Sequence, residues 1–289
     1  MKKIKVTFIG LGVMGFPMAG HLSHNGYDVC VYNRNIQKAK KWKNIYKGNF
    51  ALTPSEAVLE SDFIMTCVGQ DQDLKEVYEG KNGILKTVKK GAIIIDHTTA
   101  SAKIAKYLYK KCKSLKVGFL DAPISGGQAG AENGKLSIMI GGDKKIYNKS
   151  KDILFSYGKT INLIGPSGSG QLCKMVNQIC IAGLVQGLSE ALIFGKKSKL
   201  NMNNVLSVIS KGAAQSWQMD NRATTMINNK FNFGFAVDWM CKDLKICFNH
   251  SKLIRTNLPI TKIIYKYYKN IQKNGGNRWD TSSLISLLK

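Results

Sequence analysis

The sequence contains few acidic residues, no paired cysteines and no pattern of metal ligands. Only 18 aspartate and glutamate residues accompany 43 lysine and arginine residues among the 289, which gives a formal net charge of +25. The seven cysteines include no CxxC pair, and the four histidines lack the spacing of a metal site. These absences argue against a disulfide scaffold, predict no bound metal, and favour reduced thiols in a cytoplasmic protein.

We also expect no secretory signal and no membrane span, and the sequence shows no internal repeat or low-complexity linker. Residues 1–10 have the composition of a strand rather than of a signal peptide. The most apolar stretch, residues 168–197, carries polar side chains at intervals, so we expect a core helix there and no membrane segment. These side chains are Lys174, Asn177, Gln178, Gln186 and Glu190.

The excess of positive charge raises the question of nucleic acid, because basic surfaces attract phosphate. The lysines are spread over nearly every predicted helix, and the chain is also rich in Asn and Ile, which indicates a biased coding composition. A solvated, lysine-rich surface is a generic feature of proteins. We therefore expect no nucleic-acid partner and only a mild attraction for anionic substrates.

The chain begins with a strand, a glycine-rich loop and a helix, in the order typical of a dinucleotide-binding site. A β-rich run at 3–9 precedes GLGVMG, and a helical segment at 16–25 follows it. In such a loop the first glycine turns sharply, the second admits the pyrophosphate, and the third lets helix and strand pack closely. The sequence therefore predicts cofactor contacts from Gly10, Leu11, Gly12, Val13, Met14 and Gly15.

The end of the second predicted strand, at 27–32, indicates which dinucleotide binds. An NAD-binding fold usually places Asp or Glu just beyond this strand, whereas this chain has Asn33 and Arg34. A guanidinium suits a 2′-phosphate, so we expect NADP(H) to be preferred, with NAD(H) possible. The alternative is that Arg34 is an ordinary surface residue in a turn.

Helix and strand signals then alternate, as they do in a doubly wound parallel sheet. Loops at the carboxyl edge of such a sheet bind ligands, so Val68 and Thr99 are candidate cofactor contacts. The predicted strands lie at 63–68, 92–96, 117–121, 135–140 and 159–164, and the helices at 54–60, 73–78, 102–112 and 144–155.

A second glycine-rich stretch, DAPISGGQAG, contains Ser125, Gly126 and Gly127. A hydroxyl beside exposed backbone amides forms a suitable cradle for a carboxylate, so these three are candidate substrate-binding residues. The alternative is a plain glycine turn.

Beyond residue 168 no convincing strand follows, and helices are predicted at 203–211, 218–228, 235–251 and 260–273. The predicted fold is α/β, with a Rossmann domain at 1–165 and an all-helical domain at 166–289. The long helix at 168–197 joins them and is expected to be mostly buried. Lys174, Asn177 and Gln178 share one of its faces, either because they form a site or because they only snorkel and cap backbone groups.

Four stretches, in order and over essentially the whole chain, resemble one family. They are GLGVMGFPMAGHL, DAPISGGQAGAENG, GSGQLCKMVNQ and KDLKI. The family is the β-hydroxyacid dehydrogenases, the group of 3-hydroxyisobutyrate dehydrogenase, tartronate semialdehyde reductase and the glyoxylate/succinic semialdehyde reductases. The resemblance implies an NAD(P)-dependent oxidoreductase that acts on a small 3-hydroxy acid or semialdehyde.

The resemblance also implies roles for individual residues. Lys174 stands in the position of the catalytic lysine, and Thr99 stands beside the nicotinamide, although DHTTAS differs here from the commoner DMST. The other matches are Asn177 and Gln178, whose amides face the substrate; Ser125, Gly126 and Gly127, the substrate-carboxylate loop; Lys242 and Asp243, the pair that closes the site; and Phe235, an aromatic residue eight positions before Asp243.

The expected chemistry needs a proton carrier, because hydride transfer to or from a carbinol carbon leaves the hydroxyl proton to be moved. Lys174 can give or take this proton, and Asn177 can align the amine with the substrate oxygen. The related 6-phosphogluconate dehydrogenases carry a histidine in place of Asn177, and imine reductases lack the lysine. An inactive cofactor-sensing or nucleic-acid-associated protein is the alternative from another class.

The long helix also predicts self-association. Its apolar surface exceeds what a helical domain of ~120 residues readily covers, and its small residues allow close approach of another helix. The family resemblance likewise implies a homodimer or homotetramer formed through the helical domain. The small residues are Ala182, Gly183, Gly187 and Ala191.

Overall fold

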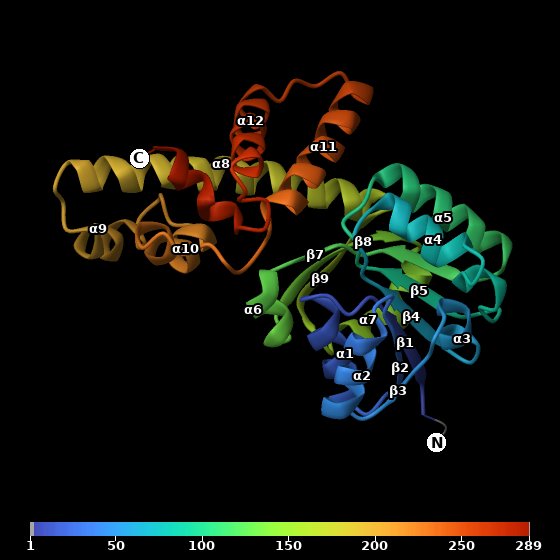
Figure 1. Cartoon of the computed structure of the whole chain (residues 1–289). Helices are drawn as coiled ribbons and strands as arrows, with labels where there is room; N and C mark the ends of the chain where they lie inside the picture. Colours follow the sequence, from blue (N-terminus) through green and yellow to red (C-terminus); the bar gives the residue numbers. More distant parts are fainter. Residues whose placement is uncertain (1–2, 289) are drawn as a thin grey trace. The chain divides into compact units, whose positions relative to one another are not determined.

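A computed structural model describes residues 3–288, and the chain forms two compact units. Unit 1 ends at Lys174 and unit 2 begins at Met175, so the division falls inside one long helix, α8 (Ser169–Lys197; Figure 1). The domain boundary predicted after residue 165 lies slightly earlier, where the last strand ends.

Unit 1 is built on a nine-stranded sheet with the order β3-β2-β1-β4-β5-β6-β8-β7, and β9 pairs with β8 (Figure 1). The central strands are short, rich in β-branched residues and almost fully buried, which is typical of a parallel sheet covered on both faces. The strands are β1 Lys5–Ile9, β2 Asp28–Tyr32, β3 Asn49–Phe50, β4 Phe63–Thr66, β5 Ile93–Asp96, β6 Gly118–Asp121, β7 Ile124–Ser125, β8 Leu136–Gly142 and β9 Gly158–Gly165.

Helices cover both faces of this sheet and so confirm the predicted doubly wound fold. One core receives side chains from α1, α2 and α7, and the other from α3, α4 and α5. The elements are α1 Gly15–His24, α2 Ile36–Ile45, α3 Pro54–Val58, α4 Asp71–Glu79, the 3-10 helix η1 Ile84–Lys86, α5 Ala102–Ser114, α6 Gly127–Glu132 and α7 Lys144–Leu154.

The sheet is parallel-dominated rather than wholly parallel. β8 runs antiparallel to β6 and β7, because the chain returns from β7 through only the short helix α6. The segment 36–50 also holds elements that the sequence pattern did not predict, α2 and β3. In α2 only Ala39 and Trp42 are buried, so its apolar pattern is weak.

Unit 2 is all-helical, as predicted, and no strand is described between β9 and residue 288. One core joins α8, α11 and α12 through buried residues such as Val185, Leu244 and Tyr268, and a second core joins α8 and α10. The elements beyond α8 are α9 Met202–Ile209, α10 Trp217–Ile227, α11 Val237–Leu253, α12 Pro259–Lys273 and the 3-10 helix η2 Thr281–Leu288.

The expectation that α8 is mostly buried is wrong for one of its faces. Val176 is 62% exposed, Leu184 47% and Phe194 74%, and Cys180, Gly187 and Ala191 are also exposed. Steps of three and four residues place all six along one stripe of the helix. By length and composition α8 is also the one described helix that meets the criteria for a membrane span, with 44% of its most apolar window buried, although core helices often meet the same criteria.

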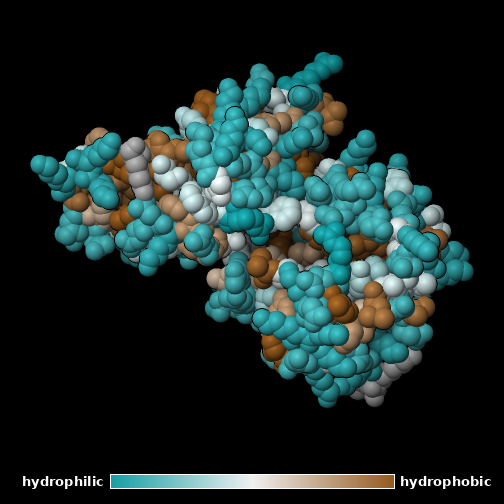
Figure 2. All heavy atoms as spheres, in the orientation of Figure 1, coloured by the Kyte–Doolittle hydropathy of each residue, from teal (hydrophilic) through white to brown (hydrophobic). Residues whose placement is uncertain are grey.

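Hydrophilic side chains cover most of the face in Figure 2, with hydrophobic residues in small groups between them. Exposed lysines occur in both units, for example Lys110 and Lys196. Such a distribution is usual for a globular surface.

Candidate functional site in the Rossmann unit and on α8

The glycine loop between β1 and α1 has the geometry that a dinucleotide requires. Gly10 has φ +100°, and a Cβ there would lie 2.2 Å from the Cys67 carbonyl oxygen. A Cβ on Gly15 would lie 2.0 Å from the Gly10 carbonyl oxygen, whereas a Cβ on Gly12 would meet no atom within 4 Å. Gly10 and Gly15 therefore serve the turn and the helix–strand contact, and the backbone at Gly12 is open to a ligand.

Asn33 supports the glycine loop from the end of β2. Its Oδ1 accepts a 2.9 Å hydrogen bond from the Leu11 amide, and its Nδ2 donates to the Asn35 carbonyl. The backbone amide of Gly10 donates to the Tyr32 carbonyl at the same strand end. Asn33 is thus placed beside the predicted cofactor loop, and both ends of its amide already bind the protein.

Arg34 extends into solvent at the same edge. Its side chain is 91% exposed and lies 3.6 Å from an Asp73 carboxylate oxygen at the start of α4. An exposed ion pair of this kind is weak, so the guanidinium can exchange partners at little cost. The sequence pattern did not reveal Asp73, an acidic neighbour that would compete with a phosphate.

The loops after β4 and β5 are joined through Asp96 and Thr98. The Val68 amide donates to Thr98 Oγ1 over 3.0 Å, and the Thr98 amide donates to Asp96 Oδ1 over 3.1 Å. Asp96 is fully buried and also accepts from Thr66 Oγ1. Burial raises the Asp96 pKa to about 7, an effect that its hydrogen bonds from Thr66 and Thr98 only partly offset.

Asp121, at the end of β6, anchors the beginning of α8. Its two oxygens accept from the Gly168 amide at 2.7 Å and from the Gln171 amide at 3.0 Å. Burial raises the pKa of Asp121, whereas these backbone bonds lower it. A Cβ on Gly170 would lie within 2.5 Å of the Asp121 carbonyl oxygen, so the helix end and the strand end pack in direct backbone contact.

Gln171 connects the same helix turn to the loop that carries Thr99. It is fully buried, its Oε1 accepts from the Ala100 amide at 2.9 Å, and its Nε2 donates to the Thr98 carbonyl at 2.7 Å. The Gln171 side chain therefore fixes the backbone on both sides of Thr99, at Thr98 and at Ala100. Asp96, Asp121 and Gln171 were not among the predicted site residues, although the last two lie within glycine-rich motifs that were singled out.

Lys174 lies one helical turn beyond Gln171 and is only 7% exposed. Its Nζ donates a 2.8 Å hydrogen bond to the carbonyl of Ile124, the residue before Ser125. Gly126 and Gly127 follow with φ values of +128° and +63°, a backbone conformation that favours glycine. The structure therefore brings the predicted lysine to the predicted carboxylate loop, within unit 1.

In unit 2, Gln178, Asp243 and Lys242 form a buried polar group. Gln178 Nε2 donates to Asp243 Oδ2 over 2.7 Å, and Lys242 Nζ lies 3.2 Å from Asp243 Oδ1. Asp243 is fully buried, so these contacts compensate the cost of its charge. Asn177 donates to Gln178 Oε1 and continues the group along α8.

Phe235 lies in a loop that a second buried carboxylate holds. Its backbone amide donates to Asp280 Oδ2 over 2.8 Å, and Arg222 Nε lies 3.2 Å from Asp280 Oδ1. The Arg222 guanidinium itself stacks against the rings of Trp217 and Phe233. The loop before α11 is therefore rigidly attached to the chain before η2.

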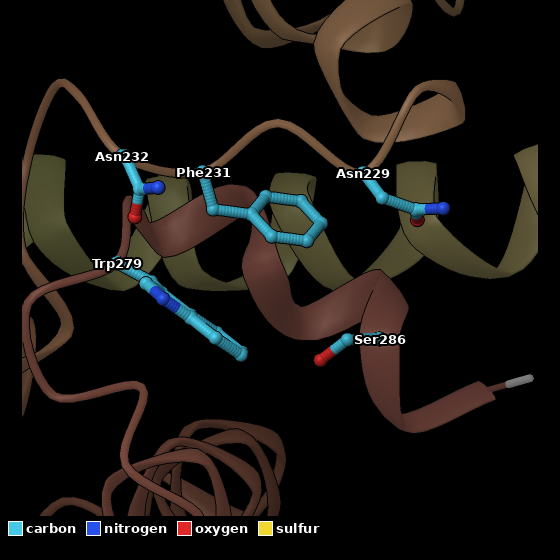
Figure 3. A pocket seen from close by; sticks show the side chains of 5 residues that line it. All are labelled: Asn229, Phe231, Asn232, Trp279 and Ser286. Atoms are coloured by element: carbon cyan, nitrogen blue, oxygen red, sulfur yellow. The ribbon is translucent and has the colours of Figure 1, made fainter.

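Two cavities in unit 2 are lined by residues other than the predicted site residues. The cavity shown in Figure 3 has a volume of about 280 Å³ and is lined by Asn229, Phe231, Asn232, Trp279 and Ser286. Among residues 3–288 there is also no group of three or more His, Cys, Asp or Glu side chains arranged to hold a metal ion. The open backbone at Gly12 remains the feature that fits a bound dinucleotide.

Comparisons with known proteins agree with this geometry. The family described as NAD binding domain of 6-phosphogluconate dehydrogenase matches residues 5–165. The family described as NAD-binding of NADP-dependent 3-hydroxyisobutyrate dehydrogenase matches residues 168–288. Both matches support a nicotinamide cofactor.

Individual relatives extend over the whole chain. An uncharacterized oxidoreductase of Shewanella frigidimarina (strain NCIMB 400) is 52% identical over 285 residues, which cover 99% of this chain and 98% of the relative. The 2-hydroxy-3-oxopropionate reductase of Escherichia coli (strain K12) is 34% identical over 287 residues, covering 99% and 97%. The structure of Mycobacterium tuberculosis 3-hydroxyisobutyrate dehydrogenase with L-serine aligns with a TM-score of 0.89 at 25% identity, covering 100% of each chain. The chain belongs to the β-hydroxyacid dehydrogenase family and is an NAD(P)-dependent oxidoreductase of the hydroxyacid dehydrogenase type.

Proposed function

We propose that this protein interconverts a small 3-hydroxy acid and its semialdehyde, with NADP(H) as the preferred cofactor and Lys174 as the proton carrier. One observation carries the proposal: the buried amine of Lys174 donates to the carbonyl of Ile124, which directly precedes the Ser125-Gly126-Gly127 loop. When bound, the nicotinamide supplies or accepts the hydride at the carbinol carbon. The protein must then place the substrate and move one proton.

Lys174 is suited to move this proton because its amine is buried and is held by the Ile124 carbonyl. Its hydrogen bond to the Ile124 carbonyl holds the amine beside Ser125, the first residue of the proposed carboxylate loop. As a general acid it protonates the alkoxide oxygen during reduction, and as a general base it removes the hydroxyl proton during oxidation. Asn177, one turn further along α8, is proposed to align the same oxygen.

Ser125, Gly126 and Gly127 are proposed to bind the substrate carboxylate. Gly126 and Gly127 adopt positive φ values in sequence, which turns the chain sharply after β7. Successive backbone amides in such a turn can converge on an anion. A carboxylate at this loop would place the substrate beside the residue whose carbonyl already holds Lys174.

A reductase of tartronate, glyoxylate or succinic semialdehyde is the second candidate. Its support is the 34% identity with a 2-hydroxy-3-oxopropionate reductase. Substrates of this class differ by a methyl or a carboxylate, and each such difference is worth about 1–3 kcal/mol in a pocket. Few pocket side chains therefore separate the two candidates.

A spectrophotometric panel tests both proposals. Nicotinamide absorbance is followed with NADP(H) and NAD(H), in both directions, across small hydroxyacids and semialdehydes. We expect turnover with at least one 3-hydroxy acid or semialdehyde pair, and faster turnover with NADP(H). Absence of turnover with every pair and both cofactors would reject the proposed reaction and favour a cofactor-sensing role.

A further inference from the structure

We propose that Gln171 is a positioning residue that fixes the Thr98–Ala100 segment against the helix turn that carries Lys174. The proposal rests on the function proposed above, because it assigns a purpose to the link between two parts of that site. Gln171 lies in the first turn of α8, and Lys174 follows three residues later on the same helix. No role was assigned to this residue from the sequence.

The side chain of Gln171 makes two hydrogen bonds of opposite sense to one short loop. Its Oε1 accepts from the Ala100 amide at 2.9 Å, and its Nε2 donates to the Thr98 carbonyl at 2.7 Å. The amide of glutamine carries its donor and its acceptor on two separate atoms and has one charge state near neutral pH, so it can bind both backbone groups at once. The residue between its two partners is Thr99, the candidate nicotinamide neighbour.

The backbone of Gln171 is fixed independently, so the side chain is attached to a rigid base. Its amide donates to Asp121 Oδ2 over 3.0 Å, and the neighbouring Gly168 amide donates to Asp121 Oδ1. One turn later Lys174 binds the Ile124 carbonyl. The beginning of α8 is therefore tied to the ends of three successive strands, β5 through Gln171, β6 through Asp121 and β7 through Lys174.

This arrangement determines the distance between the loop at Thr99 and the amine of Lys174. A catalytic group that is displaced by about 1 Å can lose on the order of 10²-fold in rate, even when the displaced contact lies outside the reacting atoms. Loss of the Gln171 bonds would release the loop while Asp121 and Ile124 continue to hold the helix. The expected defect is in turnover more than in stability or cofactor affinity.

The test uses Gln171→Met, which keeps the length of the side chain and removes both hydrogen bonds. Gln186→Met is the matched control, because Gln186 is a buried amide on the same helix whose Nε2 donates to Glu190 Oε1, outside the proposed site. We expect kcat of Gln171→Met to fall by about 10–100-fold, with a cofactor Kd within about threefold of the wild type. The control should retain wild-type kcat.

Gln171→Glu adds a second measurement, the pH dependence of kcat, which would not change if Gln171 had only a structural role. A protonated glutamic acid can donate to Thr98 and accept from Ala100, whereas the carboxylate can only accept. The ratio of this variant's kcat to the wild-type kcat, measured at the same pH, should therefore rise towards one as pH falls. A kcat ratio to wild type that is independent of pH would contradict the two-bond arrangement.

Hydrogen exchange separates failure of this inference from failure of the proposed function. In Gln171→Met the amide of Ala100 should exchange faster, while the amide of Met65 in β4 should keep its wild-type rate. Wild-type protein without turnover on any substrate would reject the proposed function alone, and the exchange result would still decide the link. Unchanged exchange at Ala100, or wild-type kcat in Gln171→Met, would overturn the inference.

Discussion

Lys174 Nζ donates a 2.8 Å hydrogen bond to the carbonyl of Ile124, fifty residues earlier in the chain. The amine is thereby held by a strand of the Rossmann unit, at the loop that contains Ser125. A buried amine with a fixed protein acceptor is already oriented before a substrate arrives. This relationship is the centre of the proposed mechanism.

The glycine loop provides a matched pair of substitutions. Gly12→Ala should leave the free energy of unfolding nearly unchanged, because a Cβ there meets no atom within 4 Å, but it should weaken cofactor binding. Gly15→Ala should destabilise the protein by about 1–3 kcal/mol, because its Cβ would strike the Gly10 carbonyl. Urea unfolding and cofactor titration measure the two effects. Equal losses of stability in both variants would contradict this division.

Arg34→Ala tests the choice of dinucleotide. The guanidinium is exposed and pairs only weakly with Asp73, so it is available to a 2′-phosphate. We expect the factor by which Kd for NADPH rises to be at least ten times the factor for NADH, since a lost charge-assisted hydrogen bond is worth about 1.5–3 kcal/mol. Lys110→Ala, at an exposed position of α5, is the control. A similar rise for both cofactors would reject the phosphate contact.

Asp96→Asn tests the buried carboxylate between the cofactor loops. The folded-state pKa of Asp96 is about 7, above the usual value near 4 in an unfolded chain. Between these values the folded protein holds a proton that the unfolded chain has lost, so Asp96 makes stability fall as pH rises from about 4 to 7, by up to about 1.4 kcal/mol per pH unit. The Asp96→Asn variant should lose this contribution to the slope of the unfolding free energy against pH.

Urea unfolding at several pH values measures that slope. Asp152→Asn, at an exposed position of α7, is the control and should retain the wild-type slope. Burial also raises the pKa of Asp121, so the Asp96 variant is expected to keep a smaller slope of the same sign. A wild-type slope in Asp96→Asn would show that this carboxyl does not titrate in the proposed range.

Much of the fold could be predicted because local and long-range signals agree. GLGVMG followed by a helical pattern predicted the first turn and its helix, and the short apolar run at 92–96, set among alternating helix and strand signals, predicted a strand. The segment 36–45 was missed because two buried residues in ten give little periodicity. The antiparallel pairing of β8 was missed because strand direction follows from the short return through α6.

The candidate site could be predicted only where residue type indicates chemistry. Lys174 and the Ser125–Gly127 loop stand out as a charge in an apolar helix and as a glycine pair. Gln171 and Asp121 do not stand out, because their importance arises from partners that are distant in sequence, such as Thr98 and Gly168. Sequence spacing cannot show which buried polar group binds which backbone atom.

The exposed stripe of α8 supports the prediction of a homo-oligomer formed through unit 2. Leu184 is 47% exposed on this stripe, and replacing it by lysine would bury a charge in any interface formed there. We expect Leu184→Lys to shift the wild-type oligomer towards smaller species in sedimentation equilibrium at micromolar concentration. Leu59→Lys, at an exposed leucine of unit 1, should leave the distribution unchanged. A monomeric wild-type protein would overturn the prediction.

The most direct test of the account is the turnover of Lys174→Met, measured beside cofactor affinity and the pH dependence of kcat. Methionine keeps much of the buried volume and removes the amine that binds Ile124. If Lys174 carries the proton, kcat should fall by about 10²–10⁴-fold and its pH profile should differ from that of the wild type, while the cofactor Kd stays nearly constant. Near-wild-type kcat with an unchanged pH profile would show that another group moves the proton.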